Sequence, residues 1–99
     1  MSVKTKSYYI NLLREHKQIL EREYGITRVG IFGSVATERN NGKSDVDVCV
    51  EMKKPDMFLM IDAKNDLQKL FHCDVDIVRL RNNMNPFLYK IIRETAIYA

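Results

Sequence analysis

Two aspartates, Asp45 and Asp47, stand at the start of an apolar run and are separated by a single valine. Side chains on a strand alternate between the two faces of a sheet, so we expect both carboxylates on one face and Val46 on the other. Two neighbouring carboxylates repel each other, which destabilises the protein when both are charged. A divalent cation offsets this repulsion, and Mg²⁺ prefers hard oxygen ligands, including water and substrate phosphate. The pair therefore predicts metal-assisted chemistry on a phosphate.

A glycine–serine pair precedes these aspartates, with ten residues between Ser34 and Asp45. We expect the pair to follow a strand over 27–32 and to open a short helical segment over 34–39. Free N–H groups at such a turn attract anions, and Gly33 has no side chain to keep a phosphate away from the backbone. Taken alone, the pair is better explained as an ordinary turn with serine as the N-cap. Its spacing from the aspartates favours phosphate binding, in which the serine hydroxyl is a further donor.

Two more aspartates, Asp74 and Asp76, occur in a third apolar segment, 74–79. If this segment is a strand, both carboxylates lie on one face, while Val75 and Ile77 face the core. The alternation therefore does not decide which of the two carboxylates joins the first pair.

Helical and strand patterns alternate along the chain, which predicts an α/β layer with a small central sheet. Gly25 is expected to end the first helix, Asp56 to cap the second, and Asn85-Pro86 to open the third. The expected elements are helices over 6–24, from 56 to about 71 and from 85 onward, strands over 27–32, 45–51 and 74–79, and a loop over 40–44. The residues expected in the core are Tyr9, Leu12, Leu13, Leu20 and Tyr24, then Val46, Val48 and Val50, then Leu59 or Met60, Ala63, Leu67, Leu70 and Phe71, and finally Phe87, Leu88, Ile91 and Ile92.

The composition is ordinary for a soluble globule, and we expect a single domain over residues 1–99. Hydrophobic residues make up 45% of the chain, and the net charge is +3. The basic residues are spread along the chain, which disfavours nucleic acid as a partner. No apolar run approaches the roughly 18 residues of a membrane span, and no secretory pattern opens the chain, so we expect a cytoplasmic protein. Cys49 and Cys73 are expected to be free, and His16 to lie on the surface.

The order Gly33-Ser34, ten residues, Asp45-Val46-Asp47 resembles the signature of the nucleotidyltransferase superfamily that shares the catalytic core of DNA polymerase beta. That family has a third carboxylate in a later Val-Asp-hydrophobic-Val sequence, and this chain has Val75-Asp76-Ile77-Val78. The resemblance therefore selects Asp76 over Asp74.

The last residues, 92–98, are similar to the end of the smallest members, the minimal nucleotidyltransferases. The resemblance covers about residues 8–99, nearly the whole chain. It implies a polymerase beta-like α/β fold with a small mixed sheet and helices packed mainly on one face, which leaves the other face open for a site.

The resemblance also implies a chemistry for the candidate residues. Asp45, Asp47 and Asp76 would bind two Mg²⁺ ions, and Gly33 and Ser34 would bind the triphosphate of ATP. Asp76 would take the proton of an acceptor hydroxyl, which attacks the α-phosphate while pyrophosphate leaves.

The acceptor is expected to come from a partner, because we expect no second domain that would bind it. In the minimal nucleotidyltransferases this partner is often a helical HEPN toxin. The leading hypothesis is thus an antitoxin that transfers AMP from ATP to a tyrosine hydroxyl of such a toxin. Three alternatives stay open: a non-catalytic protein that neutralises its partner by occlusion, transfer to a small molecule with a homodimer completing the site, and transfer to an RNA end.

Overall fold

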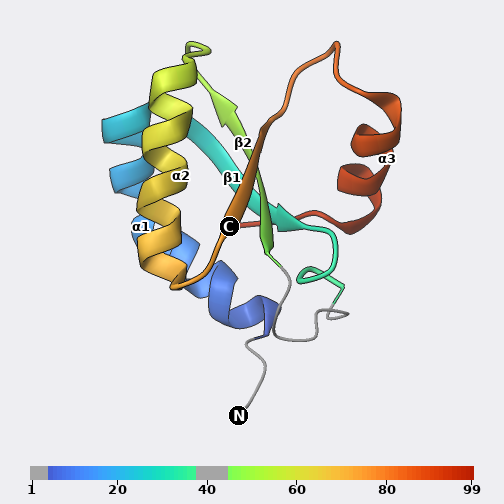
Figure 1. Ribbon diagram of the computed structural model, residues 1–99, viewed down its shortest axis with the longest axis horizontal. Coiled ribbons are helices and arrows are strands. Elements are labelled where there is room, and N and C mark those ends of the chain that lie inside the picture. The colour runs from blue at the N-terminus through green and yellow to red at the C-terminus, as the bar shows by residue number, and fades with distance from the viewer. Residues whose placement is uncertain (1–4, 38–44) are drawn as a thin grey trace.

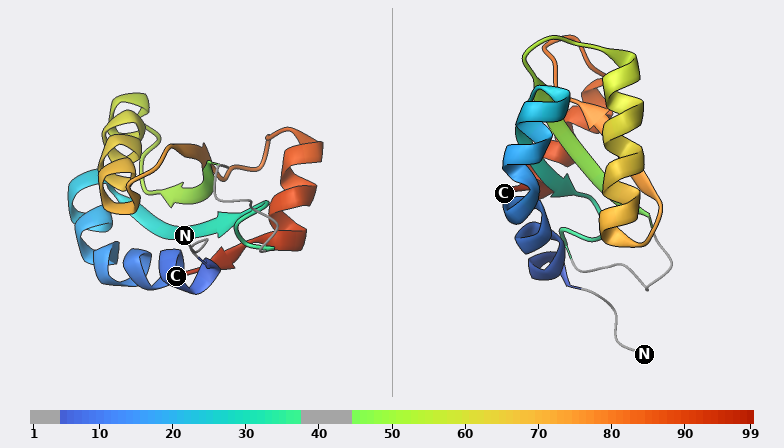
Figure 2. Two further views of the ribbon diagram at one scale, coloured as in Figure 1. Left: turned by 60° about the horizontal axis from the view of Figure 1, so that its bottom comes forward. Right: turned by 90° about the vertical axis from the view of Figure 1, so that its left-hand side faces the viewer.

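The computed structural model describes residues 5–37 and 45–99. The elements in these residues are α1 (Lys6–Tyr24), β1 (Ile26–Phe32), β2 (Val46–Met52), α2 (Met57–Phe71), β3 (Val75–Arg79), α3 (Pro86–Thr95) and β4 (Ile97–Tyr98). The strands lie in the order β3-β2-β1-β4 (Figures 1 and 2). Because β1 is antiparallel to β2 and β4 while β2 and β3 are parallel, the sheet is mixed, as predicted. None of the helices in the described residues is long and apolar enough to cross a membrane.

The predicted bounds of α1 and α2 and the predicted start of α3 are confirmed, because they depend on local capping groups. α1 ends where Gly25 adopts a φ of +70°. The carboxylate of Asp56 accepts hydrogen bonds from two N–H groups at the start of α2, at 2.9 and 3.1 Å. Asn85 caps α3 in the same way, and Pro86 follows it, where no N–H donor is needed. The loop predicted over 40–44 lies outside the described residues.

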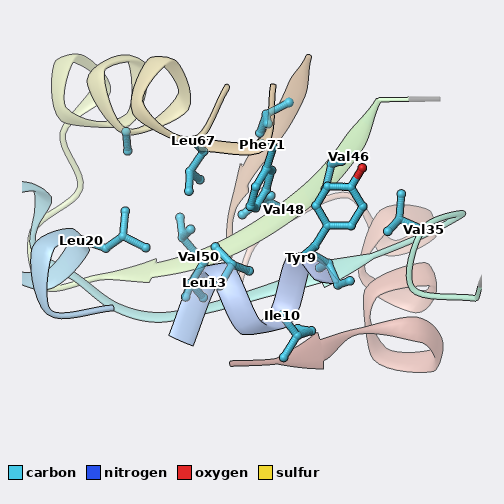
Figure 3. Packing of buried hydrophobic residues seen from close by; sticks show 14 of the residues in the cluster. Tyr9, Ile10, Leu13, Leu20, Val35, Val46, Val48, Val50, Leu67 and Phe71 are labelled. Atoms are coloured by element: carbon cyan, nitrogen blue, oxygen red, sulfur yellow. The ribbon is translucent and has the colours of Figure 1, made fainter. Parts of the chain in front are cut away.

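α1 and α2 pack against one face of the sheet and enclose the main core (Figures 2 and 3). Val46, Val48 and Val50 of β2 belong to this core, and each is fully buried. The predicted direction of these valines is confirmed, and alternation places Asp47 on the opposite face. The helices bury Tyr9, Ile10, Leu13, Leu20, Ala63, Leu67 and Phe71 in the same core.

α3 packs on the opposite face of the sheet, where Ile92 forms a smaller cluster with Phe32 and Cys49. The prediction that four side chains of α3 face the core is wrong for two of them. Phe87 is 77% exposed and Ile91 is 36% exposed, and Ile92 is the buried residue of this helix. Helical spacing identifies an apolar stripe, but it does not show how much of that stripe the sheet can cover. The second face of the sheet is therefore partly covered, and α3 keeps an apolar surface of its own.

β4 was not expected, because two residues are too few to show an alternating pattern. Ile97 pairs with Ile31, and Tyr98 pairs with Gly30. A Cβ atom at Gly30 would lie 2.7 Å from the backbone oxygen of Ile97 and 2.8 Å from the ring of Tyr98. The absence of a side chain at Gly30 thus lets the end of the chain close onto β1.

Candidate active site

The carboxylates predicted on separate strands meet on the sheet face opposite α1 and α2. The parallel register of β2 and β3 pairs the Cα atoms of Asp47 and Asp76. Asp47 is half-buried, Asp76 is exposed on an edge strand, and Asp45 is exposed just before β2. Asp74 instead contributes its backbone oxygen, which accepts a hydrogen bond from the N–H of Val46 at 3.1 Å. Of the two aspartates that alternation could not separate, Asp76 is the one in register with Asp47.

The carboxylates of Asp76 and Asp45 act electrostatically on that of Asp47. Burial raises the pKa of Asp47 above its usual range, and the negative charges of Asp76 and then Asp45 raise this pKa further. Such a shift means that the folded protein disfavours the charged form of Asp47. A cation bound among these carboxylates would favour the charged form of Asp47 and so lower its pKa.

The turn after β1 comes directly against the carboxylate of Asp47. Gly33 has a φ of +75°, and a Cβ atom at this position would lie 2.5 Å from Oδ2 of Asp47. Both the backbone conformation and the short distance require glycine. The structure therefore brings the predicted Gly-Ser turn and the predicted aspartates into one site.

Residues 33–37 form one hydrogen-bonded turn, so of the one or two helical turns expected over 34–39 the described residues contain a single turn that is not continued; residues 38 and 39 lie outside the described residues. The N–H and the hydroxyl of Thr37 both donate to the backbone oxygen of Gly33, each at 3.1 Å. Side-chain bonds of this kind compete with helix formation. Ser34 is half-buried in this turn. An anion here would meet a single turn and not the N-terminus of a helix.

Thr95, at the end of α3, holds this turn and was not singled out as a site residue by the sequence reasoning. Its hydroxyl accepts a hydrogen bond from the N–H of Gly33 at 2.9 Å and donates to the backbone oxygen of Ile91 at 2.7 Å. The N–H of Gly33 is thus paired within the protein. The only sequence signal for Thr95 was its place in the C-terminal segment that resembles the minimal nucleotidyltransferases.

The carboxylates fit an open magnesium site better than a closed one. Within residues 5–37 and 45–99, no three acidic, histidine or cysteine side chains are gathered closely enough to enclose a metal ion. Mg²⁺ usually takes one or two carboxylates from a protein and fills its other positions with water and substrate phosphate. Asp47 and Asp76 in register, with Asp45 beside them, can supply such ligands.

Comparison with known proteins identifies the family. The family model described as "Polymerase beta, Nucleotidyltransferase" matches residues 14–99. The Methanocaldococcus jannaschii protein named "Putative protein adenylyltransferase MJ1217" is 35% identical over 97 residues, which cover 97% of this chain and 99% of that protein. Among solved structures, "Structure of putative minimal nucleotidyltransferase" matches with a TM-score of 0.74 at 28% identity, over 98% of both chains.

A chain in a solved complex of a tri-AMPylated Shewanella oneidensis HEPN toxin with an MNT antitoxin has the same fold, with a TM-score of 0.65. This match has 18% identity and covers 95% of this chain and 71% of that chain. The family match spans most of the chain and includes every residue of the site described above. This chain therefore belongs to the polymerase beta nucleotidyltransferase family and is a nucleotidyltransferase.

Proposed function

We propose that this protein is a Mg²⁺-dependent antitoxin that transfers AMP from ATP to a tyrosine hydroxyl of a HEPN-type toxin. The observation that carries the proposal is the register of Asp47 with Asp76, with Gly33 against Asp47. The similarity to proteins named as adenylyltransferases, and to a chain in a complex with an AMPylated HEPN toxin, supports this acceptor. A single domain over 1–99 and a cytoplasmic location stay predictions from the sequence.

Each residue of the site has a role in this proposal. Asp45, Asp47 and Asp76 would hold two Mg²⁺ ions, which supply charge neutralisation at the triphosphate and favour loss of the acceptor proton. The turn at Gly33 lies against Asp47, so Ser34 in this turn would offer its N–H and hydroxyl to a triphosphate bound beside that carboxylate. Thr95 keeps this turn in place through its bond to Gly33.

Transfer of AMP requires one bond to form and one to break. The tyrosine oxygen forms a bond to the α-phosphorus of ATP, and the bond from that phosphorus to the oxygen bridging to the β-phosphate breaks. Asp76, exposed on the edge strand, accepts the tyrosine proton, and pyrophosphate leaves with the bridging oxygen. The protein therefore mainly positions the reactants and stabilises charge.

The decisive experiment is a transfer assay with a defined acceptor. The chain is purified with the protein encoded next to it and incubated with Mg²⁺ and ATP labelled at the α-phosphate. We expect label on a tyrosine of that protein, located by mass spectrometry, and no label with Asp47→Asn.

The outcomes separate this proposal from its rival, neutralisation by occlusion. Neutralisation of the toxin by Asp47→Asn without any transfer would favour occlusion. A neighbouring gene that encodes no HEPN-type protein would remove the toxin from the proposal, while the family assignment would stand.

A further inference from the structure

We infer that the hollow beside β3 receives the acceptor segment of the partner protein, and that this segment is apolar and acidic. The inference rests on the proposed transfer to a protein acceptor. The hollow has a volume of about 580 Å³ and lies between the start of α2, the second half of β3 and the segment that leads into α3. Figure 1 shows β3 between α2 and α3, the elements that contribute lining residues to the hollow.

The hollow adjoins the residue that would accept the tyrosine proton. Ile77 and Val78 line it, and they directly follow Asp76 on β3. A strand rises about 3.3 Å per residue, so Val78, two residues on and on the same face by alternation, lies ~7 Å from Asp76 along the strand. β3 is an edge strand of the described sheet, which leaves its outer side accessible. A peptide that places its tyrosine at Asp76 therefore extends naturally over the hollow.

The lining and the rim of the hollow are mainly apolar. Met57, Met60 and Met84 line it, and methionines adapt readily to the side chains of a partner. Phe58 and Phe87 follow or precede a lining residue in the sequence, and they are 80% and 77% exposed. Large apolar side chains gathered on a surface commonly mark a protein interface.

The charged residues of the lining are predominantly basic. Lys64, Arg79 and Arg81 line the hollow, and the one carboxylate among its lining residues is that of Asp56. Oδ1 of that carboxylate accepts the capping hydrogen bonds of α2, and three basic side chains outnumber this one negative charge. An acidic segment complements this charge, which speeds association and disfavours basic partners.

The same charge could also attract the triphosphate of ATP, but the geometry argues against it. The turn at Gly33 follows β1, and β2 lies between β1 and β3. Neighbouring strands are about 4.8 Å apart, so the turn and the edge of β3 are separated by roughly 10 Å across the sheet. The hollow is thus on the acceptor side of the aspartates, away from the Gly33 turn.

The test uses the full chain and two synthetic peptides of equal length, each with one central tyrosine. The first peptide surrounds the tyrosine with glutamate and leucine, and the second has lysine in place of every glutamate. Binding is measured by fluorescence anisotropy without nucleotide, so the result does not depend on ATP binding. We expect the acidic peptide to bind tighter by on the order of tenfold.

Charge-reversal variants connect this binding to the hollow. Lys64→Glu and, as a second variant, Arg79→Glu should each weaken binding of the acidic peptide by on the order of tenfold and leave the melting shift with Mg-ATP unchanged. Arg22→Glu is the matched control, because Arg22 is 71% exposed on α1 and outside the hollow. This control should bind the acidic peptide like the wild type.

Four results would overturn the inference. The first is equal binding of the two peptides, and the second is binding of the acidic peptide that neither charge reversal weakens. The third is loss of the melting shift with Mg-ATP in Lys64→Glu. The fourth is a dimer of the wild-type chain, seen by sedimentation, that the charge reversals dissociate. The third result would assign the hollow to the nucleotide, and the fourth would assign it to a second copy of the chain. Absence of any Mg-ATP shift in the wild type would contradict the proposed function instead, and the peptide data would still be interpretable.

Discussion

Asp47 is the residue at which stability and the proposed chemistry oppose each other. Its pKa is raised by burial and by the charges of Asp76 and Asp45. For a carboxyl group with a raised pKa in the folded state, stability is greatest when the group is protonated and is lost as pH rises through the folded pKa. The ligand-free protein is thus expected to be destabilised at neutral pH by the carboxylate that its proposed chemistry requires.

Asp47→Asn should therefore raise the melting temperature of the ligand-free protein at neutral pH by a few degrees. The difference should shrink as the pH falls and the wild-type Asp47 becomes protonated. The variant should also lose the stabilisation by Mg-ATP, because a ligand stabilises only the state that it binds. Thermal unfolding at neutral and acid pH, with Asp74→Asn as the control, measures both effects. A lower melting temperature at neutral pH would instead mark Asp47 as a structural residue.

Asp76 and Asp74 provide a second comparison at the residue level. If Asp76 accepts the tyrosine proton, Asp76→Ala should slow AMP transfer by roughly 10²–10⁴-fold and weaken ATP binding far less. Asp74→Ala should stay within a few fold of the wild type in both measurements. Transfer rates and ATP affinities of the two variants, measured side by side, decide the point. The assignment fails if Asp74→Ala is the inactive variant or if Asp76→Ala lowers both quantities equally.

Thr95 tests whether the Gly33 turn must be held in place. Thr95→Val keeps the shape of the side chain but leaves the N–H of Gly33 without its acceptor, which costs about 1–3 kcal/mol if water cannot replace it. We expect weaker binding of ATP with little change in the transfer rate at saturating ATP. Thr95→Ser restores the hydroxyl and should recover the affinity. Equal ATP affinity in Thr95→Val and the wild type would show that the turn holds without this bond.

Among the elements, α1 and α2 are joined by a polar contact that the sequence did not indicate. Oδ2 of Asp66 accepts a hydrogen bond from the hydroxyl of Tyr24 at 2.9 Å and lies 2.9 Å from Nε2 of His16. The expectation of a surface histidine is wrong, since only 16% of the side chain of His16 is exposed. Charged neighbours along α1 say nothing about the position of α2, which covers this side of the helix.

The hydroxyl of Tyr24 gives this contact a measurable pH dependence. The pKa of Tyr24 is raised from 10.0 to about 12, mainly by burial and next by the hydrogen bond to Asp66. The stabilisation from a raised tyrosine pKa is fully present below pH 10 and is lost as pH rises from 10 to about 12. We therefore expect the wild type to be more stable than Tyr24→Phe below this window and to lose the advantage across it. Urea unfolding of both proteins across this range would detect the change, and a constant difference would contradict it.

At the scale of the whole molecule, β4 pairs with β1 and forms the edge of the sheet opposite β3. A side chain at Gly30 would meet the backbone of Ile97, which cannot move without breaking the pairing of β4. Gly30→Ala should thus cost roughly 1–3 kcal/mol of stability, as overpacking does. It should also speed amide exchange at Ala99, whose N–H donates to the backbone oxygen of Val29 at 2.9 Å.

Urea unfolding and amide exchange measure these two effects. Asn11→Ala, an exposed change on α1, should alter neither quantity. A Gly30→Ala protein with wild-type stability and exchange would mean that β4 can shift without loss.

The sequence by itself determined the features that depend on neighbouring residues. Caps such as Asp56 and Asn85 act within one turn of a helix, so the helix boundaries could be predicted. Alternation over a few residues separates Val46 and Val48 from Asp47, so the core face of β2 could be predicted as well. The spacing of Gly33 and Ser34 from the aspartates indicated the family before any geometry was known.

The tertiary structure alone decided the features that join distant residues. The parallel pairing of β2 and β3 places Asp76, which the family resemblance had already selected, in register with Asp47, and the packing of α3 brings Thr95 to Gly33. It also decided that Phe87 stays exposed and that β4 pairs with β1. These contacts leave no periodic pattern in the sequence, because they result from which apolar surfaces pack together over the whole chain and not from the conformational preferences of neighbouring residues.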